Sequence, residues 1–266
     1  MYPRIVPDTS YGRVYEVDEG IFFPSVSTIP SHGMPTSPFL LKWFIENSKG
    51  DYEKHCKYSS QGSEVGTFVH DCIDKMLEGD EIKISPNPLD HIRGKGYYPT
   101  YKASVEIKKA LLSFVVWYNE NQPKIIAKEE MLYCLDKKGK DYKFPFAGRC
   151  DMIAEIDDEL WLLDTKTSKA VEKQPGMQCQ LSIYKMLWDA THDRKIDRMG
   201  IIWARKDYTA NNPPSGVKTT YEYQYDEDLV RETYQMFKRF YTGFDLGFNK
   251  KPKKRVPLID TFKLEI

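Results

Sequence analysis

Apolar and polar residues follow regular periods over most of this chain. Apolar residues recur at helical spacing in "SEVGTFVHDCIDKMLEGD" and "YKASVEIKKALLSFVVWYNENQ", so each segment is predicted to form a helix with one apolar face. Strand-like runs follow, and Pro175 stands where the first turn of a helix favours proline. The elements predicted from residue 63 are helices 63–80 and 101–122, strands 125–135, 145–156 and 159–166, a helix from Pro175, strands 199–206 and 217–225, and a helix 227–243. This order is typical of a mixed α/β domain.

The N-terminal part has a different pattern. "GRVYEV" and "GIFFPSVSTI" predict a β-hairpin that turns at residues 18–20, and Ser37-Pro38 and Gly50 bound a predicted helix. Pro and Gly are frequent in residues 84–100, which predicts an exposed loop. We therefore expect three parts, namely an N-terminal hairpin and helix extension over 1–60, an α/β core over 61–245 and a basic C-terminal tail over 246–266.

The segment "AGRCDMIAEIDDELWLLDTKTSK" joins two strand-like runs by a pair of aspartates. If this pair, Asp157-Asp158, forms a two-residue turn, counting back from the turn places Asp151 opposite Asp164. Opposite residues on paired strands have Cβ atoms about 4.5–5.5 Å apart, so both carboxylates can reach one cation. An odd-length loop would break this register. Because side chains alternate along a strand, Lys166 shares a face with Asp164, and the other face of the hairpin is apolar and predicted to be core.

These charged residues suggest a particular chemistry. Two carboxylates at such a separation repel each other unless a cation or a proton lies between them. Oxygen ligands suit Mg²⁺ or Mn²⁺ better than zinc, and a nearby ammonium group orients a water or stabilises charge on a phosphate. The set predicts metal-assisted hydrolysis of a phosphodiester. The alternative is that Asp164 and Lys166 form only an ion pair at a strand end, because a three-residue D-x-K match is common.

Further motifs surround the hairpin in a fixed order. "GTFVH", a glutamate pair, "GRCD", "LLDTKTSK" and "QLSIY" together resemble the RecB-type nuclease family of the PD-(D/E)xK superfamily, over roughly residues 60–190. "PSVSTI" and "FLLKW" nearer the N-terminus resemble phage-encoded exonuclease members of that family. Cys150 stands where the superfamily name expects proline, a departure that RecB-type members tolerate. The resemblance implies a restriction-endonuclease-like core with a mixed central sheet flanked by helices.

The resemblance also implies roles for individual residues. Asp151, Asp164 and Lys166 are expected to be catalytic. The expected metal ligands are His70, Glu129, Asp151, Asp164 and the carbonyl group of Thr165. Either Glu129 or Glu130 could supply the acidic ligand, because alternation makes them face opposite ways, and the spacing to the following residues favours Glu129.

Nucleic-acid contacts are expected from four residues. Gln180 and Tyr184 are four positions apart and share a helix face, and the resemblance implies that they hold nucleic acid or the catalytic lysine near the metal. Arg149 and Lys169 flank the acids in sequence and are candidates for phosphate contact. The run "NKKPKKR" is either a guide for a phosphate backbone or a solvated tail.

Composition changes this picture little. An apolar fraction of 41% indicates a folded protein, and a net charge of zero gives no sign of a polyanion partner, although a local basic groove would suffice. Five separate cysteines, no recognisable signal peptide and no long apolar run favour a cytoplasmic protein without disulfides or membrane spans. No cysteine follows Cys179, so the iron–sulfur cluster of some relatives is not expected.

We therefore predict a Mg²⁺- or Mn²⁺-dependent DNA nuclease, an exonuclease by family analogy, that acts in DNA recombination, repair or replication. Its partner is single- or double-stranded DNA. The alternatives are a structure-specific endonuclease, a non-catalytic DNA-binding module on the same fold, and a phosphohydrolase for small phosphates, which the lack of further ligand clusters disfavours.

Overall fold

The structure of the chain is a computed structural model. It describes residues 3–6, 12–36, 38, 41–42, 45–46, 49, 51–82, 101–168, 171, 174–206 and 220–240. The strands are β1 (Arg4–Val6), β2 (Val14–Asp18), β3 (Ile21–Pro24), β4 (Lys124–Tyr133), β5 (Lys137–Lys138), β6 (Asp141–Tyr142), β7 (Ala147–Ile156), β8 (Glu159–Lys166), β9 (Arg198–Trp203) and β10 (Thr220–Tyr223). The helices are α1 (Thr28–Gly33), α3 (Tyr52–Leu77), α4 (Tyr101–Asn121), α5 (Pro175–Thr191) and α6 (Glu227–Phe240).

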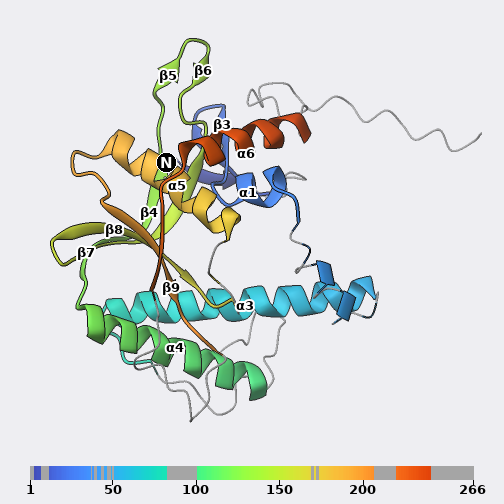
Figure 1. Ribbon diagram of the computed structural model, residues 1–266, viewed down its shortest axis with the longest axis vertical. Helices are drawn as coiled ribbons and strands as arrows, with labels where there is room; N and C mark the ends of the chain where they lie inside the picture. The colour runs from blue at the N-terminus through green and yellow to red at the C-terminus, as the bar shows by residue number, and fades with distance from the viewer. Residues whose placement is uncertain are drawn as a thin grey trace, which may run out of the picture.

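A five-stranded mixed sheet forms the centre of the molecule. Its strand order is β10-β9-β8-β7-β4, in which β8 and β9 are parallel and the other neighbours are antiparallel. Helices α3 and α4 cover one face of this sheet, and α1, α5 and α6 lie on the other side (Figure 1). The predicted α/β class with a mixed sheet flanked by helices is therefore confirmed.

Both faces of the β7–β8 hairpin are buried, including the face that ends in the two acids and the lysine. Met152, Ala154 and Leu163 pack in the core under α3 and α4, as expected. Ile153 and Leu162, on the other face, are also fully buried, in the larger core under α5 and α6. The predicted core face is therefore confirmed, and the second face is buried as well because the hairpin lies inside a sheet that helices cover on both sides.

The turn of this hairpin has the predicted register. Ile156 pairs with Glu159, and Asp157 and Asp158 form a two-residue turn with φ angles of 50° and 63°. Two successive residues in the left-handed region are typical of a type I′ turn, whose twist matches that of the strands. The turn thus fixes which residues of β7 and β8 lie opposite each other.

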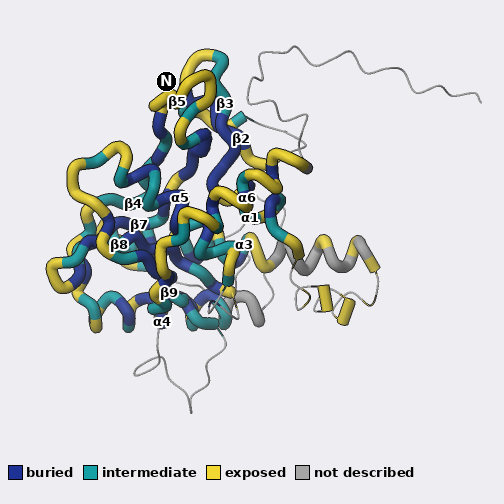
Figure 2. The backbone as a smooth tube through the Cα atoms, turned by 45° about the horizontal axis from the view of Figure 1, so that its top comes forward, coloured by how far each residue is buried: buried dark blue, intermediate teal, exposed yellow. Residues whose placement is uncertain are grey.

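The N-terminal hairpin is confirmed, but its second strand is shorter than predicted. β2 and β3 pair as expected, and β3 ends at Pro24 because α1 begins at Thr28. Ser25 forms a bridge with Ala147, and the Val26 amide donates to the Ala147 carbonyl at 2.9 Å. The N-terminal part is therefore joined to the start of β7 through buried residues. The strands of the central sheet are likewise largely buried (Figure 2).

Other differences concern boundaries and short elements. Helix α3 begins at Tyr52 and so crosses the expected boundary at residue 60. Three short elements were not predicted, namely β1, α1 and the β5–β6 hairpin. The predicted loop 84–100, the basic tail and Lys169 lie outside the described residues, as does most of the predicted helix 37–50. No helix in the described part of the chain combines the length and apolarity that a membrane crossing requires.

Candidate active site

The β7 and β8 strands separate at the end away from their turn. Their paired residues run from Ile156–Glu159 back to Met152–Leu163. Beyond that point the backbone N–H of Thr165 donates to Oδ2 of Asp151 at 2.8 Å. A carboxylate thus takes the place of a backbone acceptor, and Asp151 is held at the point where the sheet opens.

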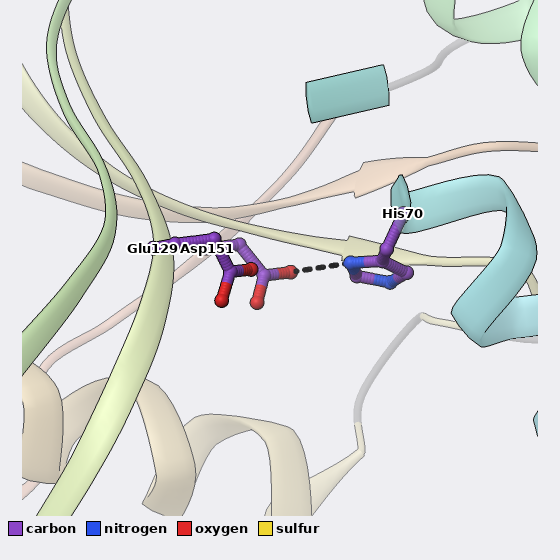
Figure 3. A group of neighbouring side chains, drawn as sticks. All are labelled: His70, Glu129 and Asp151. Carbon is purple, nitrogen blue, oxygen red and sulfur yellow. Dashed lines mark ion pairs between the residues drawn. The ribbon is translucent and has the colours of Figure 1, made fainter. Parts of the chain in front are cut away.

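Three possible metal ligands converge on this opening from three different elements. His70 comes from α3, Glu129 from β4 and Asp151 from β7, and their ligand atoms all lie within 4.8 Å of one another (Figure 3). The imidazole Nδ1 of His70 is 3.4 Å from Oδ2 of Asp151. All three residues are partly exposed, so a small cation can reach them from solvent.

The backbone of β4 decides which of the two adjacent glutamates joins the cluster. Glu129 has a φ of +49°, which is rare for a residue with a long side chain, and its carboxylate lies beside His70 and Asp151. Glu130 instead occupies an ordinary ladder position opposite Cys150. The backbone therefore brings Glu129, and not Glu130, to the cluster with His70 and Asp151. Glu129 is also the residue that the sequence spacing favours.

Asp164 and Lys166 form a second, more buried group beside the cluster. Asp164 is only 2% exposed, and its Oδ1 accepts a hydrogen bond from Nε2 of Gln180 at 2.8 Å. Its Oδ2 forms an ion pair with Nζ of Lys166 at 2.5 Å. The D-x-K pair is an ion pair, as the alternative interpretation expected, in which Asp164 is buried and Lys166 is partly exposed.

The electrostatics of the two groups are those of an incompletely neutralised acidic site. Burial, and then the nearby Asp164 carboxylate, raise the pKa of Asp151. Burial alone would lower the pKa of Lys166, but the carboxylates of Asp164 and Asp151 outweigh it and raise that pKa. Lys166 is therefore held as a protonated cation, whereas burial favours the protonated form of Asp151.

These residues fit a divalent cation. Carboxylates from Glu129 and Asp151, with an imidazole from His70, form a donor set of the kind that divalent cations accept. Burial and the neighbouring Asp164 carboxylate raise the pKa of Asp151, so a cation bound beside these two carboxylates would stabilise their charged forms.

Comparison with known proteins agrees with this geometry. The family model of the PD-(D/E)XK nuclease superfamily matches residues 40–251. The chain belongs to this superfamily. The restriction-endonuclease-like core predicted from the sequence is thereby confirmed.

Individual proteins are only distantly similar to this nuclease-superfamily chain. The solved structure of a phage-related exonuclease from Haemophilus somnus 129PT has 11% identity and a TM-score of 0.37, covering 84% of this chain and 95% of its own. The structure of SSO0001 has 15% identity and a TM-score of 0.31, covering 69% of this chain and 88% of its own. No curated protein has a significantly similar sequence.

Tyr184 is buried beneath the site rather than exposed to a ligand. It is 4% exposed, and its hydroxyl donates to the carbonyl of Arg149 at 2.8 Å. Burial raises the pKa of Tyr184, which keeps this hydroxyl protonated and able to donate. A Cβ atom at Gly148 would lie 3.0 Å from the Tyr184 ring and 2.8 Å from Val26, so only glycine permits this packing. The ring has no free face for a base, and its contacts are those of a positioning residue.

The remaining predicted residues lie around this centre. Arg149 is half-exposed, and its guanidinium is 3.6 Å from Oε2 of Glu129. Thr165 is buried, with its amide bound to Asp151 as described above. Among the described residues, only Thr167 comes within 4 Å of a Cβ built at Gly66, at an ordinary contact distance of 3.5 Å. Gly66 thus lies against the end of β8.

Sequence reasoning did not identify Asp74 and Lys128 at the edge of the site. Lys128 Nζ donates to the Asp74 carbonyl at 3.2 Å and lies 2.5 Å from Oε1 of Glu78. Burial, and then the Asp74 carboxylate, raise the pKa of Glu129. Asp74 is four positions after His70, so the two share a face of α3. This spacing is the feature of the sequence from which Asp74 could have been identified.

Proposed function

We propose that this member of the superfamily is a divalent-metal-dependent DNA exonuclease of the RecB type. The observation that carries the proposal is the convergence of His70, Glu129 and Asp151 beside a buried Asp–Lys pair, at the point where two central strands separate. A non-catalytic scaffold has no use for so much buried charge, because each uncompensated charged group lowers stability.

The residues proposed to hold Mg²⁺ or Mn²⁺ are His70, Glu129, Asp151, Asp164 and the Thr165 carbonyl. Asp164 is included because its carboxylate lies close enough to Asp151 to raise the pKa of that residue, so a cation between the two carboxylates would relieve their repulsion. When bound, such a cation polarises the scissile phosphate and makes a water molecule more acidic.

The chain's own residues supply the positioning. Lys166 is held by Asp164 and stays protonated, so its ammonium group can orient the attacking water or stabilise negative charge on the phosphate. Gln180 fixes the carboxylate plane of Asp164 through its 2.8 Å hydrogen bond. We propose direct attack by water, with no covalent intermediate.

DNA contact is proposed for Arg149, whose half-exposed guanidinium lies beside Glu129. Lys169 follows β8 in sequence and is proposed for the same role. For Gln180 and Tyr184 the contacts described above support a different role from direct DNA binding, namely positioning of Asp164 and of the Arg149 backbone. The reaction would serve DNA recombination, repair or replication.

A cleavage assay on linear single-stranded, linear duplex and circular DNA tests the proposal. It compares wild type with Asp164→Asn and with Asp157→Asn, a matched change at the exposed turn of the same hairpin, in Mg²⁺, Mn²⁺ or EDTA. Metal-dependent loss of linear DNA alone, absent in Asp164→Asn and kept in Asp157→Asn, supports an exonuclease. Nicked circles would instead show an endonuclease, and tight binding without cleavage would show a binding module.

A further inference from the structure

A groove lies on the other side of α5 from the catalytic residues. It is bounded by the β5–β6 hairpin, by the second half of α5 and by α6, and has a volume of about 1000 Å³. Phe144 and Phe146, in the segment between β6 and β7, contribute to its lining. None of the proposed metal ligands lines it, so it is a second feature of the molecule and not an extension of the active site.

The groove is strongly positive in a chain whose net charge is zero. Seven lysine or arginine side chains line it against three acidic ones. Four of the lysines are concentrated in the hairpin segment 137–143, and Arg231 and Lys238 face them from α6. One acid, Asp189, is already bound 2.8 Å from Lys185. The hairpin lysines make no ion pair with any residue that the structure describes, so their charge is available to a ligand.

Aromatic rings alternate with these cations. Tyr225 is 42% exposed, and Phe144 and Tyr234 are partly exposed. Lys143 Nζ lies 4.8 Å from the centroid of the Phe144 ring, and Lys238 Nζ lies 5.4 Å from that of Tyr234. A ring next to a cation can stack on a base while the cation pairs with the adjacent phosphate, which is how proteins bind single strands without regard to sequence.

We propose that this groove binds single-stranded DNA outside the catalytic site. The lysines alone would suit any polyanion, but accessible rings favour unpaired bases, since the bases of a duplex are already stacked and paired. The proposal deepens the proposed function, and rests on it, because it assigns the substrate a single-stranded segment.

One β-strand, β7, leads from the base of the groove to the active site. Tyr133 pairs with Ala147 at the last rung of the β4–β7 ladder, and the β5–β6 hairpin continues directly from there (Figure 1). Asp151 is four residues further along β7, which corresponds to about 13 Å of extended strand. One DNA molecule can therefore contact both places, and the hairpin would retain a strand whose end is being hydrolysed.

Binding measurements in EDTA test the groove independently of cleavage. The probe is a labelled oligothymidylate of about 20 nucleotides, longer than most single-strand binding sites. Lys138→Gln/Lys140→Gln should weaken binding about tenfold and reduce the slope of log K against log salt concentration by roughly 1.4, the value for two single-strand phosphate contacts. Lys75→Gln/Lys108→Gln, the same charge change at exposed positions of α3 and α4, should leave both quantities unchanged.

A second pair of variants tests base stacking. Tyr225→Ala should weaken binding about tenfold, whereas Tyr225→Phe, which keeps the ring, should bind as the wild type does. Equal affinity of both Tyr225 variants, or displacement of the probe by polyglutamate as effectively as by unlabelled DNA, would overturn the proposal in favour of an acidic protein partner.

The outcomes separate this proposal from the proposed function. Unchanged probe binding in the lysine variant, with metal-dependent cleavage intact, would reject the groove alone. Reduced binding in that variant, with no cleavage by the wild type, would reject the nuclease activity and keep the groove.

Discussion

The β7–β8 hairpin carries a pair of aspartates at each end, and the two pairs lie in different environments. At the closed end Asp157 and Asp158 have positive φ angles and exposed side chains, and they serve the backbone turn. At the open end Asp151 and Asp164 are held among protein groups, with an amide, a lysine and a glutamine around them. Exposed aspartates at the closed end fix the register of the strands. Enclosed aspartates at the open end form an acidic site, because burial makes a carboxylate depend on nearby donors and cations.

The largest effect should come from exchanging charge for an amide at the open end. Asp151→Asn and Asp164→Asn should each reduce the cleavage rate about 1000-fold, equivalent to some 4 kcal/mol of transition-state stabilisation. Asp157→Asn and Asp158→Asn should stay near the wild-type rate. Single-turnover cleavage measures all four, and a comparable loss at the closed end would remove the distinction between the two pairs.

The next effect concerns the packing that supports the open end. Gly148→Ala should lower the free energy of unfolding by about 1–3 kcal/mol, because its Cβ has no room beside Val26 and Tyr184. Cleavage should also slow, since Tyr184 holds the Arg149 carbonyl. Gly62→Ala is the matched control on α3, where a Cβ meets no described atom within 4 Å, and it should stabilise the protein slightly. Urea unfolding compares the two, and equal stabilities would show that the Tyr184 packing is adaptable.

A pH dependence should distinguish the two ends in the metal-free protein. The folded-state pKa of Asp151 is raised to about 7, above its unfolded value of about 3.9. Its contribution to stability is therefore complete below about pH 4 and is lost as the pH rises through about 7. In EDTA, the melting temperature of the wild type should fall between pH 5 and pH 8 by roughly 5–10 °C relative to Asp151→Asn.

Added Mg²⁺ provides the control for this pH prediction. It should restore the melting temperature of the wild type at pH 8 and have little effect on Asp151→Asn, since a ligand stabilises only the state that binds it. Identical pH profiles for the two proteins in EDTA would contradict the raised pKa. An Asp157→Asn variant should follow the wild type throughout.

The smallest effect is expected at the closed end. Asp158→Gly should stabilise the protein by about 0.5 kcal/mol, because glycine adopts a φ near 63° without steric cost. Cleavage should not change. Thermal unfolding measures the change in stability. A loss of activity would mean that the conformation of the turn affects the residues at the open end.

Whether an element can be predicted from the sequence depends on whether neighbouring residues or distant ones determine its structure. The register of the β7–β8 hairpin follows from a two-residue turn, and the long helices follow from apolar periodicity, so both were predictable. The α1 helix and the β5–β6 hairpin are too short for a periodic signal. Their positions depend on contacts with distant parts of the chain, such as the close approach of Gly33 to Thr233.

The site shows the same division. The order and spacing of Asp151, Asp164 and Lys166 were enough to propose a chemistry, since those residues lie on one hairpin. The choice of Glu129 over Glu130 depends on a left-handed residue within a strand, which no alternation rule anticipates. The role of Tyr184 depends on the absence of a side chain at Gly148, a contact between residues 36 positions apart in the printed sequence.

The place of β8 in the strand order has a consequence for how the site opens and closes. β8 is the middle strand of five, with hydrogen-bonded neighbours on both sides, whereas β4 is an edge strand and α3 packs on one face. Amide hydrogens of central strands exchange with solvent only when most of the fold opens, and those of edges exchange in smaller local openings. Asp164 and Lys166 therefore belong to the most persistent part of the molecule. His70 and Glu129 belong to parts that open more often. A cation bound by residues of both parts would link α3 and β4 to the central strands and slow amide hydrogen exchange along β4 and α3.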